Sequence, residues 1–495
     1  MTAQEVAAIA PLAFVIALAV VVVLADMVRP GDDRLVSVIG AAGSLLGIGL
    51  VALVGVGGTV QDVAGGAYQL DPLTTFLDML FLAIAFLTIL FSPDYLRPRH
   101  YPLAEYVATL LFAISGAMLI SGARDLLVLF LGLELLVLPG YMLVAYAKRD
   151  GLATEGAIKY FLLGSFSSAI FLFGLAFTWG YTGTTSVTGV ARQLQQIVDG
   201  QQPLAAGLLM GLALLTTGVA FKIAAVPFHY WTPDAYQGSP TPVTGYLSVG
   251  PKIAAFALIL RLFVEALAPL RADWVGVVVV LAALTMTLGN LVALTQDNIK
   301  RMLAYSSIAH TGYILVGLAA FAGAPPGSPA ASAGIESMLF YAAAYTFMNL
   351  GAFAVVAALQ GRPGVTSQIS TFAGLGRRAP LAAALMTLFL LSLTGIPPTA
   401  GFFAKAYVIE AALQSGGLVP WLAVIAAVNA AMAAFYYLRV VVVMYMQEPA
   451  ADAPPVTDSR PMRLGLLIAA FATVVIGLVP GVLIPMAQAA AAAIQ

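Results

Sequence analysis

The sequence predicts an all-α polytopic membrane protein with about 14 transmembrane helices. Its 495 residues are 61% hydrophobic and only 9% charged, which is too apolar for a soluble domain with a solvated surface. Apolar runs of roughly 20 residues, the length that crosses the hydrocarbon core of a bilayer, recur along the whole chain. The alternating pattern of β-barrel strands does not occur, so we expect helices, which satisfy their own backbone groups in lipid.

The first apolar run, Ala7 to Val28, has no basic region before it and no small-residue cleavage pattern. It is therefore predicted to be a retained helix and not a signal peptide. Each later span is a further apolar run. The connection between the fourth and fifth spans is short, and the number of spans could change by one there. In order, the predicted spans lie near 7–28, 35–57, 71–92, 104–121, 124–147, 155–181, 204–226, 240–262, 272–295, 301–320, 335–360, 380–411, 418–446 and 462–488.

Basic residues in the loops predict the orientation of the chain. The even-numbered loops hold only Arg124, Arg192, Arg261 and Arg271. The odd-numbered loops hold Arg29, Arg34, Arg97, Arg99, Lys148, Arg149, Lys300, Arg301, Arg362, Arg377, Arg378, Arg460 and Arg463. By the positive-inside rule, the odd loops face the cytoplasm and both termini lie on the outer side of a bacterial plasma membrane.

An internal repeat is predicted from two similar segments. Leu138 to Val144 reads LPGYMLV and His310 to Val316 reads HTGYILV, at an offset of 172 residues. Spans four to eight would then match spans nine to thirteen, and a repeat of five helices must invert on its second pass. The expected units are helices one to three (1–103), two five-helix repeats (104–262 and 263–446) and a last helix (447–495).

Five ionisable residues lie inside predicted spans: Glu134, Lys159, Lys222, Lys252 and Lys405. Such a group costs several kcal/mol in hydrocarbon unless it is paired or hydrated, so it usually marks a substrate, ion or proton path. Glu134 and Lys222 are both central in their spans and are predicted to form a pair that holds or releases a proton. The alternative is a static ion pair between two helices. Lys159 lies near the start of its span and could instead reach the interface.

Prolines and histidines accompany these groups. Pro227 follows Lys222 by five residues, and Pro397-Pro398 precedes Lys405 by seven, which predicts broken seventh and twelfth helices that line a hydrated cavity. The alternative is that these prolines only shape packing. His229 and His310 exchange protons near neutral pH and are candidates for the same path, or else packing residues. Glu105 could feed protons to Glu134, whereas Asp71 and Asp78 are predicted to be structural.

Composition excludes several other classes of function. The chain has no cysteine and only three histidines, which argues against disulfides, iron–sulfur clusters and a dedicated metal or haem site. Its net charge of -1 indicates no nucleic-acid partner. Any redox chemistry is therefore expected in partner chains.

Several longer strings resemble the antiporter-like membrane subunits of respiratory complex I, the type I NADH:quinone oxidoreductase. They are LEL at 133–135, FKIAAVPFHYWTPDAY at 221–236, Pro251-Lys252, QDNIKRMLAYSS at 296–307 and GIPPTAGF at 395–402. The resemblance implies fourteen helices, two inverted repeats and one proton channel. It also implies that Glu134, Lys222, Lys252 and Lys405 are the proton-transfer residues of helices five, seven, eight and twelve.

The resemblance further implies that NADH, FMN, iron–sulfur clusters and quinone are handled by partner subunits. Among the three homologous antiporter-like subunits, the chain is too short for subunit L with its long C-terminal lateral helix. Lys405 argues against subunit M, which has glutamate there and would be a neighbour. The third homologous subunit fits on both counts. The alternatives are a subunit of a multisubunit sodium/proton antiporter, a self-contained solute carrier, or a structural membrane spacer.

Overall fold

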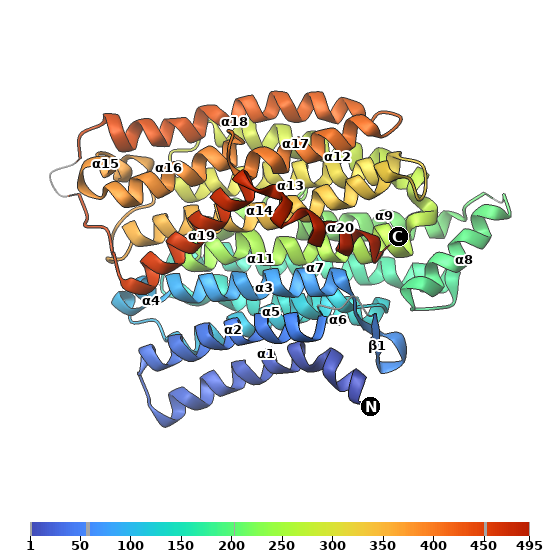
Figure 1. Cartoon of the computed structure of the whole chain (residues 1–495), viewed down its shortest axis with the longest axis horizontal. Helices are drawn as coiled ribbons and strands as arrows, with labels where there is room; N and C mark the ends of the chain where they lie inside the picture. The colour runs from blue at the N-terminus through green and yellow to red at the C-terminus, as the bar shows by residue number, and fades with distance from the viewer. Residues whose placement is uncertain (1, 56–59, 202, 450–452, 495) are drawn as a thin grey trace.

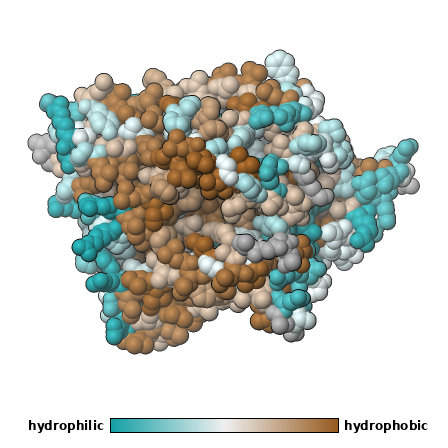
Figure 2. Space-filling view, in the orientation of Figure 1, coloured by the Kyte–Doolittle hydropathy of each residue, from teal (hydrophilic) through white to brown (hydrophobic). Residues whose placement is uncertain are grey.

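The structure is a computed structural model that describes residues 2–55, 60–201, 203–449 and 453–494. It is an all-helical bundle whose long helices run side by side (Figure 1). Twelve of these helices are long and apolar enough to cross a membrane. Figure 2 shows an apolar band across the middle of this face, with hydrophilic residues gathered toward its two ends. The prediction of a multi-pass helical membrane protein is therefore confirmed.

The first half of the chain contains eleven α-helices and one small hairpin within the described residues. In order they are α1 (Ala3–Val28), α2 (Asp33–Gly55), β1 (Gln61–Val63), β2 (Tyr68–Leu70), α3 (Pro72–Phe91), α4 (Pro93–Leu96), α5 (Leu103–Gly122), α6 (Leu126–Val144), α7 (Gly151–Thr182), α8 (Val187–Asp199), α9 (Ala206–Lys222), α10 (Trp231–Gly238) and α11 (Thr241–Ile259). A π-helical turn, Leu260–Ala266, continues α11.

The second half is built in the same way from long and short helices. In order they are α12 (Arg271–Ala293), α13 (Ile299–Gly323), α14 (Pro329–Leu359), α15 (Leu375–Arg378), α16 (Pro380–Thr394), α17 (Ala400–Gln414), α18 (Pro420–Met446), α19 (Arg460–Leu478) and α20 (Ile484–Ala492). α9 and α16 are shorter than a full membrane span and are each followed by a break and a second short helix, so neither is among the twelve.

The helix starts are set by local capping. Asp71 accepts a hydrogen bond from the Thr74 amide at 2.7 Å and caps α3. Asn298 accepts from the amides of Lys300 and Arg301 and caps α13. These side chains satisfy amides that have no partner within their own helix, which fixes where each helix begins.

The centre of the bundle is made by α11, α13 and α14. In their most apolar windows, 100%, 94% and 94% of the residues are buried, against 28% in α2 and 33% in α12. α13 packs against α12, α14 and α17, and α11 packs against α14. A helix buried on all sides can place a charged side chain only among protein atoms, which makes these three helices the place to look for a site.

Two small elements depart from the predicted spans. The antiparallel hairpin β1–β2 pairs Asp62 with Gln69, and each of its strands has only three residues. α8 is an amphipathic helix that buries Val187, Val190 and Leu194 and projects from the right of the bundle in Figure 1. A search for apolar runs misses both elements, because neither is apolar throughout.

Candidate functional site

Lys222 is the last residue of α9 and points toward α7. Its side chain is buried, and Nζ donates to Ser168 Oγ at 2.9 Å and to the Gly164 carbonyl at 3.4 Å. Glu134, on α6, acts electrostatically on Lys222, but no ion pair joins the two within the described residues. One Glu134 carboxylate oxygen is buried without a hydrogen-bond partner. The predicted pair is thus brought together without direct contact.

A small cavity lies beside Lys222. Its volume is about 10 Å³, and its lining includes Leu133, Lys222, Trp231 and Pro251. Leu133 precedes Glu134 on α6, and Pro251 precedes Lys252 on α11. A cavity of this volume has room for about one water molecule, which would lie next to Lys222.

The first helix break begins earlier than Pro227. α9 ends at Lys222, and Pro227 lies in the irregular segment before α10, so the prediction that span seven continues to 226 is wrong at this end. Two groups released by the break find partners on neighbouring helices: the Ile223 carbonyl accepts from Thr311 Oγ1 at 2.9 Å, and the Val226 amide donates to Thr285 Oγ1 at 3.0 Å. Irregular backbone at membrane depth requires such partners.

His229 follows the break but joins no hydrogen-bond chain in the described residues. Its side chain is buried, Nδ1 has no hydrogen-bond partner, and the ring stacks on Tyr230 with 4.6 Å between centroids. Tyr305 lies edge-on to it at 6.5 Å. A connection from His229 to the lysines would need water.

Lys252 is fixed by α13. Its Nζ donates to the Ser307 carbonyl and to Ser307 Oγ, both at 2.6 Å, and its side chain is 4% exposed. The same Ser307 carbonyl also accepts from Thr311 Oγ1 at 3.2 Å. Since Thr311 also bonds the Ile223 carbonyl, a short series of polar groups leads from the end of α9 to Lys252.

His310 continues this polar row one turn further along α13. Its Nδ1 is 2.7 Å from Tyr341 Oη and its Nε2 is 3.3 Å from Tyr437 Oη. Tyr437 also shares a short hydrogen bond with Ser306. The histidine is buried between two hydroxyls that can each accept or donate, so its tautomer can be exchanged along the row.

Lys405 lies at the second break. α16 ends at Thr394 and α17 begins at Ala400, with Pro397 and Pro398 between them. Nζ of Lys405 donates to the carbonyls of Leu393 and Thr394 at 3.0 and 2.7 Å. It also lies 4.8 Å from the centre of the Tyr313 ring. Lys405 therefore caps the negative end of α16 inside the bundle.

Lys159 and Glu105 lie apart from this row. The Lys159 side chain is 41% exposed and pairs with Glu155 at 2.5 Å and Asp234 at 2.6 Å. Arg301 pairs with the other oxygen of Asp234 at 2.7 Å. This partly exposed cluster matches the interfacial alternative for Lys159 better than a position on the buried row.

Glu105 is exposed in the first turn of α5, and its helix meets the part of α6 next to Glu134 at Gly116. Eleven residues of helix separate Glu105 from Gly116, a rise of about 16 Å. Glu105 therefore does not contact Glu134.

Two buried cations were not recognised from the sequence, because both were assigned to loops. Lys300 is 3% exposed, and its Nζ donates to the carbonyls of Gln237 and Ser239 at 2.9 and 2.5 Å, at the end of α10. Arg261 is fully buried in the π-helical turn after α11. Both residues adjoin the end of a predicted span, and the sequence alone does not indicate that their side chains point into the bundle.

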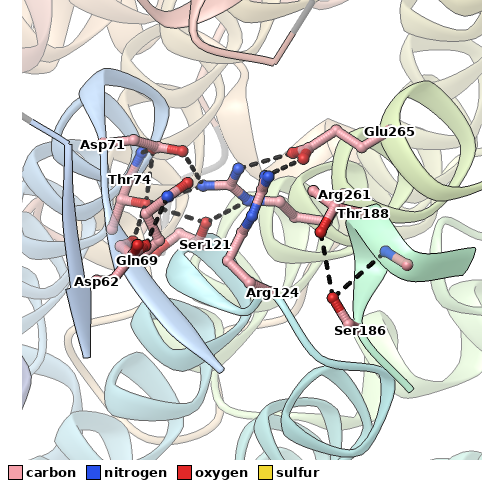
Figure 3. A network of polar contacts seen from close by, with 11 residues as sticks. Asp62, Gln69, Asp71, Thr74, Ser121, Arg124, Ser186, Thr188, Arg261 and Glu265 are labelled. Carbon is pink, nitrogen blue, oxygen red and sulfur yellow. Dashed lines mark hydrogen bonds and ion pairs between the residues drawn. The ribbon is translucent and has the colours of Figure 1, made fainter. Parts of the chain in front are cut away.

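Arg261 is the centre of an ionic network (Figure 3). It pairs with Asp71 at 2.7 Å and Glu265 at 2.7 Å, and its Nε donates to the Ser121 carbonyl at 2.8 Å. Arg124 makes a further short contact with Glu265. The network joins the starts of α3 and α6 to the end of α11, which agrees with a structural role for Asp71.

Asp78, the other aspartate predicted to be structural, lies inside the bundle. It is fully buried, accepts from Ser121 Oγ at 2.6 Å, and its second oxygen has no hydrogen-bond partner.

Comparison with known proteins identifies the class of this chain. A family model described as "NADH:quinone oxidoreductase/Mrp antiporter, TM" matches residues 123–432, more than half of the chain. NADH-quinone oxidoreductase subunit N of Trichlorobacter lovleyi is 41% identical over 446 residues, which cover 90% of this chain and 88% of that protein. The chain therefore belongs to the family of NADH:quinone oxidoreductase/Mrp antiporter membrane subunits. Within it, the chain is most like subunit N, as the arguments from length and Lys405 favoured.

Solved structures agree with this assignment. A chain of respiratory complex I from Thermus thermophilus, solved with bound aureothin, matches with a TM-score of 0.78 and 31% identity, covering 96% of this chain and 98% of that one. A chain of the Mrp complex from Dietzia sp. DQ12-45-1b matches with a TM-score of 0.83 at 21% identity, covering 100% and 98%. The second likeness shows the shared fold alone.

Proposed function

We propose that this chain is the proton-translocating membrane subunit N of a bacterial NADH:quinone oxidoreductase. The observation that carries the proposal is the row of buried cations and hydroxyls along α13. Lys252 is bound to Ser307, His310 lies between two tyrosine hydroxyls, and Lys405 lies against Tyr313. Buried ionisable groups of this kind are expensive in a membrane and mark a path for protons or ions.

The proposed path begins at Glu134 and Lys222, crosses the centre through Lys252 and His310, and ends at Lys405. Lys222, Lys252 and Lys405 are each held by neutral oxygens, and among the described residues no carboxylate contacts them directly. A lysine without a bound carboxylate leaves no buried counterion unpaired when it releases its proton. Lys159, Glu105 and His229 would serve this path only at its edges or through water.

The proposed topology is fourteen crossings, with α9 and α10 forming the seventh and α16 and α17 the twelfth. Two inverted five-helix repeats would then occupy 104–262 and 263–446, between an N-terminal unit (1–103) and a last helix (447–495). In support, a break lies next to a buried lysine in each proposed repeat, at Lys222 and at Lys405. Both termini would lie on the outer side of the plasma membrane.

In this proposal the chain is a translocating subunit without a redox centre. NADH, FMN, iron–sulfur clusters and quinone would be bound by partner subunits, and subunit M and small membrane subunits would be its neighbours in the bilayer. No cluster of three or more potential metal ligands occurs among the residues that the structure describes. Electron transfer elsewhere would alter the field at Glu134 and Lys222 and drive the proton along the row.

The test is a Lys222→Ala variant in the assembled complex. We expect NADH-driven proton pumping to fall, because the side chain that accepts the proton beside Glu134 is gone. Full pumping by a correctly assembled Lys222→Ala complex would contradict the proposed role of this residue. Sodium-dependent exchange without NADH would instead favour a subunit of a multisubunit antiporter, which the fold shared with the Mrp chain leaves open.

A self-contained solute carrier is less well supported. The cavity that reaches Lys222 has a volume of only about 10 Å³. Pockets for small organic molecules usually measure about 300–1,000 Å³. This cavity suits water and protons better than a solute.

A further inference from the structure

A separate cavity opens between the first turns of α16 and α19, near the loops that carry most of the basic residues. It has a volume of about 540 Å³. Its polar lining comprises Arg378, Thr457, Asp458 and Arg463, and its apolar lining includes Leu381. The two helices are in contact beside it. None of Lys222, Lys252 and Lys405 lines this cavity, so proton transfer along those residues does not explain its chemistry.

One positive charge in this cavity lacks an acidic partner in the described part of the chain. Arg463 donates through Nε to Asp458 at 2.9 Å, with a second short contact between the same side chains, so this pair is neutral. Arg378 instead donates to the carbonyls of Pro454 and Thr371, at 2.5 and 2.7 Å. Carbonyls neutralise no charge, which leaves a net charge of about +1, the complement of one phosphodiester.

The lining changes from polar to apolar along the helices. Arg378 precedes α16, Leu381 is in its first turn, and Leu385 lies one turn deeper, about 6 Å along the axis. Leu466 continues the apolar wall on α19. Outside the cavity, Leu464 and Leu467 are 50% and 45% exposed. This order of charge at the mouth and exposed hydrocarbon beyond it matches a molecule with a charged head and apolar tails.

We propose that this cavity binds one anionic glycerophospholipid, with its phosphodiester at Arg378 and an acyl chain against Leu381, Leu385 and Leu466. Basic pockets between membrane helices on the cytoplasmic side are suited to anionic head groups. Arginine suits this ligand because its planar guanidinium can present two N–H groups to one phosphate. The proposal is independent of the proton-translocating role.

The test measures phospholipid bound to the chain in its purified native membrane assembly. After a delipidating detergent wash, dioleoyl phosphatidylglycerol is added and bound lipid is counted by native mass spectrometry. Dioleoyl phosphatidylcholine and inorganic phosphate are the comparison probes. Arg378→Gln is expected to weaken phosphatidylglycerol binding about ten-fold or more, the loss that follows from removing a charged hydrogen bond. Arg377→Gln is the matched control, because Arg377 is exposed and lies outside the cavity.

Replacing Arg378 could also disturb the loop whose carbonyls it binds. A second pair of variants therefore tests lipid binding without changing Arg378. Leu381→Trp fills the apolar part of the cavity and leaves Arg378 unreplaced, and Leu464→Trp adds the same side chain outside the cavity. Only Leu381→Trp should reduce binding. Unchanged phosphatidylglycerol binding in both cavity variants would overturn the proposal. So would equal binding of phosphatidylcholine, or full displacement of the lipid by inorganic phosphate, since each removes the need for an anionic lipid.

Discussion

Replacing Lys252 by methionine should stop proton transfer through this chain while leaving its stability almost unchanged. The ammonium group is buried and donates two hydrogen bonds of 2.6 Å to Ser307. No carboxylate pairs with it in the described residues. Methionine has nearly the same length and shape, so it can occupy the space without opening a cavity.

The expected change in the free energy of unfolding follows from two opposing contributions. Losing two hydrogen bonds to a charged group costs about 1.5–3 kcal/mol each. Removing a buried ammonium recovers a desolvation penalty of several kcal/mol. These contributions nearly cancel, so the net change should stay within about 2 kcal/mol in either direction. Function and stability are therefore expected to separate in this variant.

The assay is NADH oxidation and dye-monitored proton uptake by the same reconstituted vesicles. Lys252→Met should lower the number of protons moved per NADH by at least the number that normally passes through this chain. Lys252→Arg is the informative companion, because arginine keeps the charge and the bonds to Ser307 but does not release its proton. A wild-type proton ratio in both variants, in complexes that assemble normally, would refute the role of Lys252 as a carrier.

Three further changes test the fold around the site, each by thermal unfolding of the purified assembly. Arg261→Leu should destabilise the chain by about 3–5 kcal/mol, because it leaves buried carboxylates without their cation; an unchanged melting temperature would contradict this. Thr311→Val should cost about 1–3 kcal/mol, since the Ile223 carbonyl loses its donor at the break, whereas a conservative Thr311→Ser should not. Gly116→Ala should cost about 1–3 kcal/mol, because a Cβ there would lie 2.3 Å from the Leu136 amide nitrogen; a wild-type melting curve would show that the two helices separate freely.

Most of the helical architecture could be predicted from the sequence, because bilayer thickness sets a length that apolar runs must match. The same criterion fails for α8 and for the hairpin β1–β2, which are held by packing and pairing and not by hydrophobicity. It also misjudges where α9 ends. Pro227 marks the break in the sequence, but the helix already ends at Lys222. The next carbonyl, that of Ile223, accepts a hydrogen bond from Thr311 on α13, which is far away in the sequence.

The buried lysines could be located from the sequence, because a charge inside an apolar run is visible as such. What holds each of them could not, since Ser307, Ser168 and Thr394 are ordinary residues until the helices pack. Lys300 and Arg261 were assigned to loops for the opposite reason. Each adjoins the end of a span, and only the tertiary structure shows that its side chain turns into the bundle.

Two of the buried lysines bind carbonyls at the C-terminal end of a short helix, and a third is the last residue of one. This placement bears on how a proton could leave them. Lys222 ends α9, Lys405 binds the last carbonyls of α16, and Lys300 binds carbonyls at the end of α10. A helix C-terminus carries a partial negative charge that favours the protonated amine by about 0.3–2 kcal/mol. At Lys405 that preference must be overcome at the moment of release, when the Leu393 and Thr394 carbonyls lose a donor.

An altered field alone would leave those two carbonyls without a partner, which is costly in a buried site. A movement that replaces the Lys405 ammonium by water or by another donor avoids this cost. The irregular segment between α16 and α17 adjoins these carbonyls and begins at Gly395, which has a positive φ of 91°. Proton release at Lys405 therefore has a lower free-energy cost if this helix break rearranges than if only the charge changes in a rigid bundle.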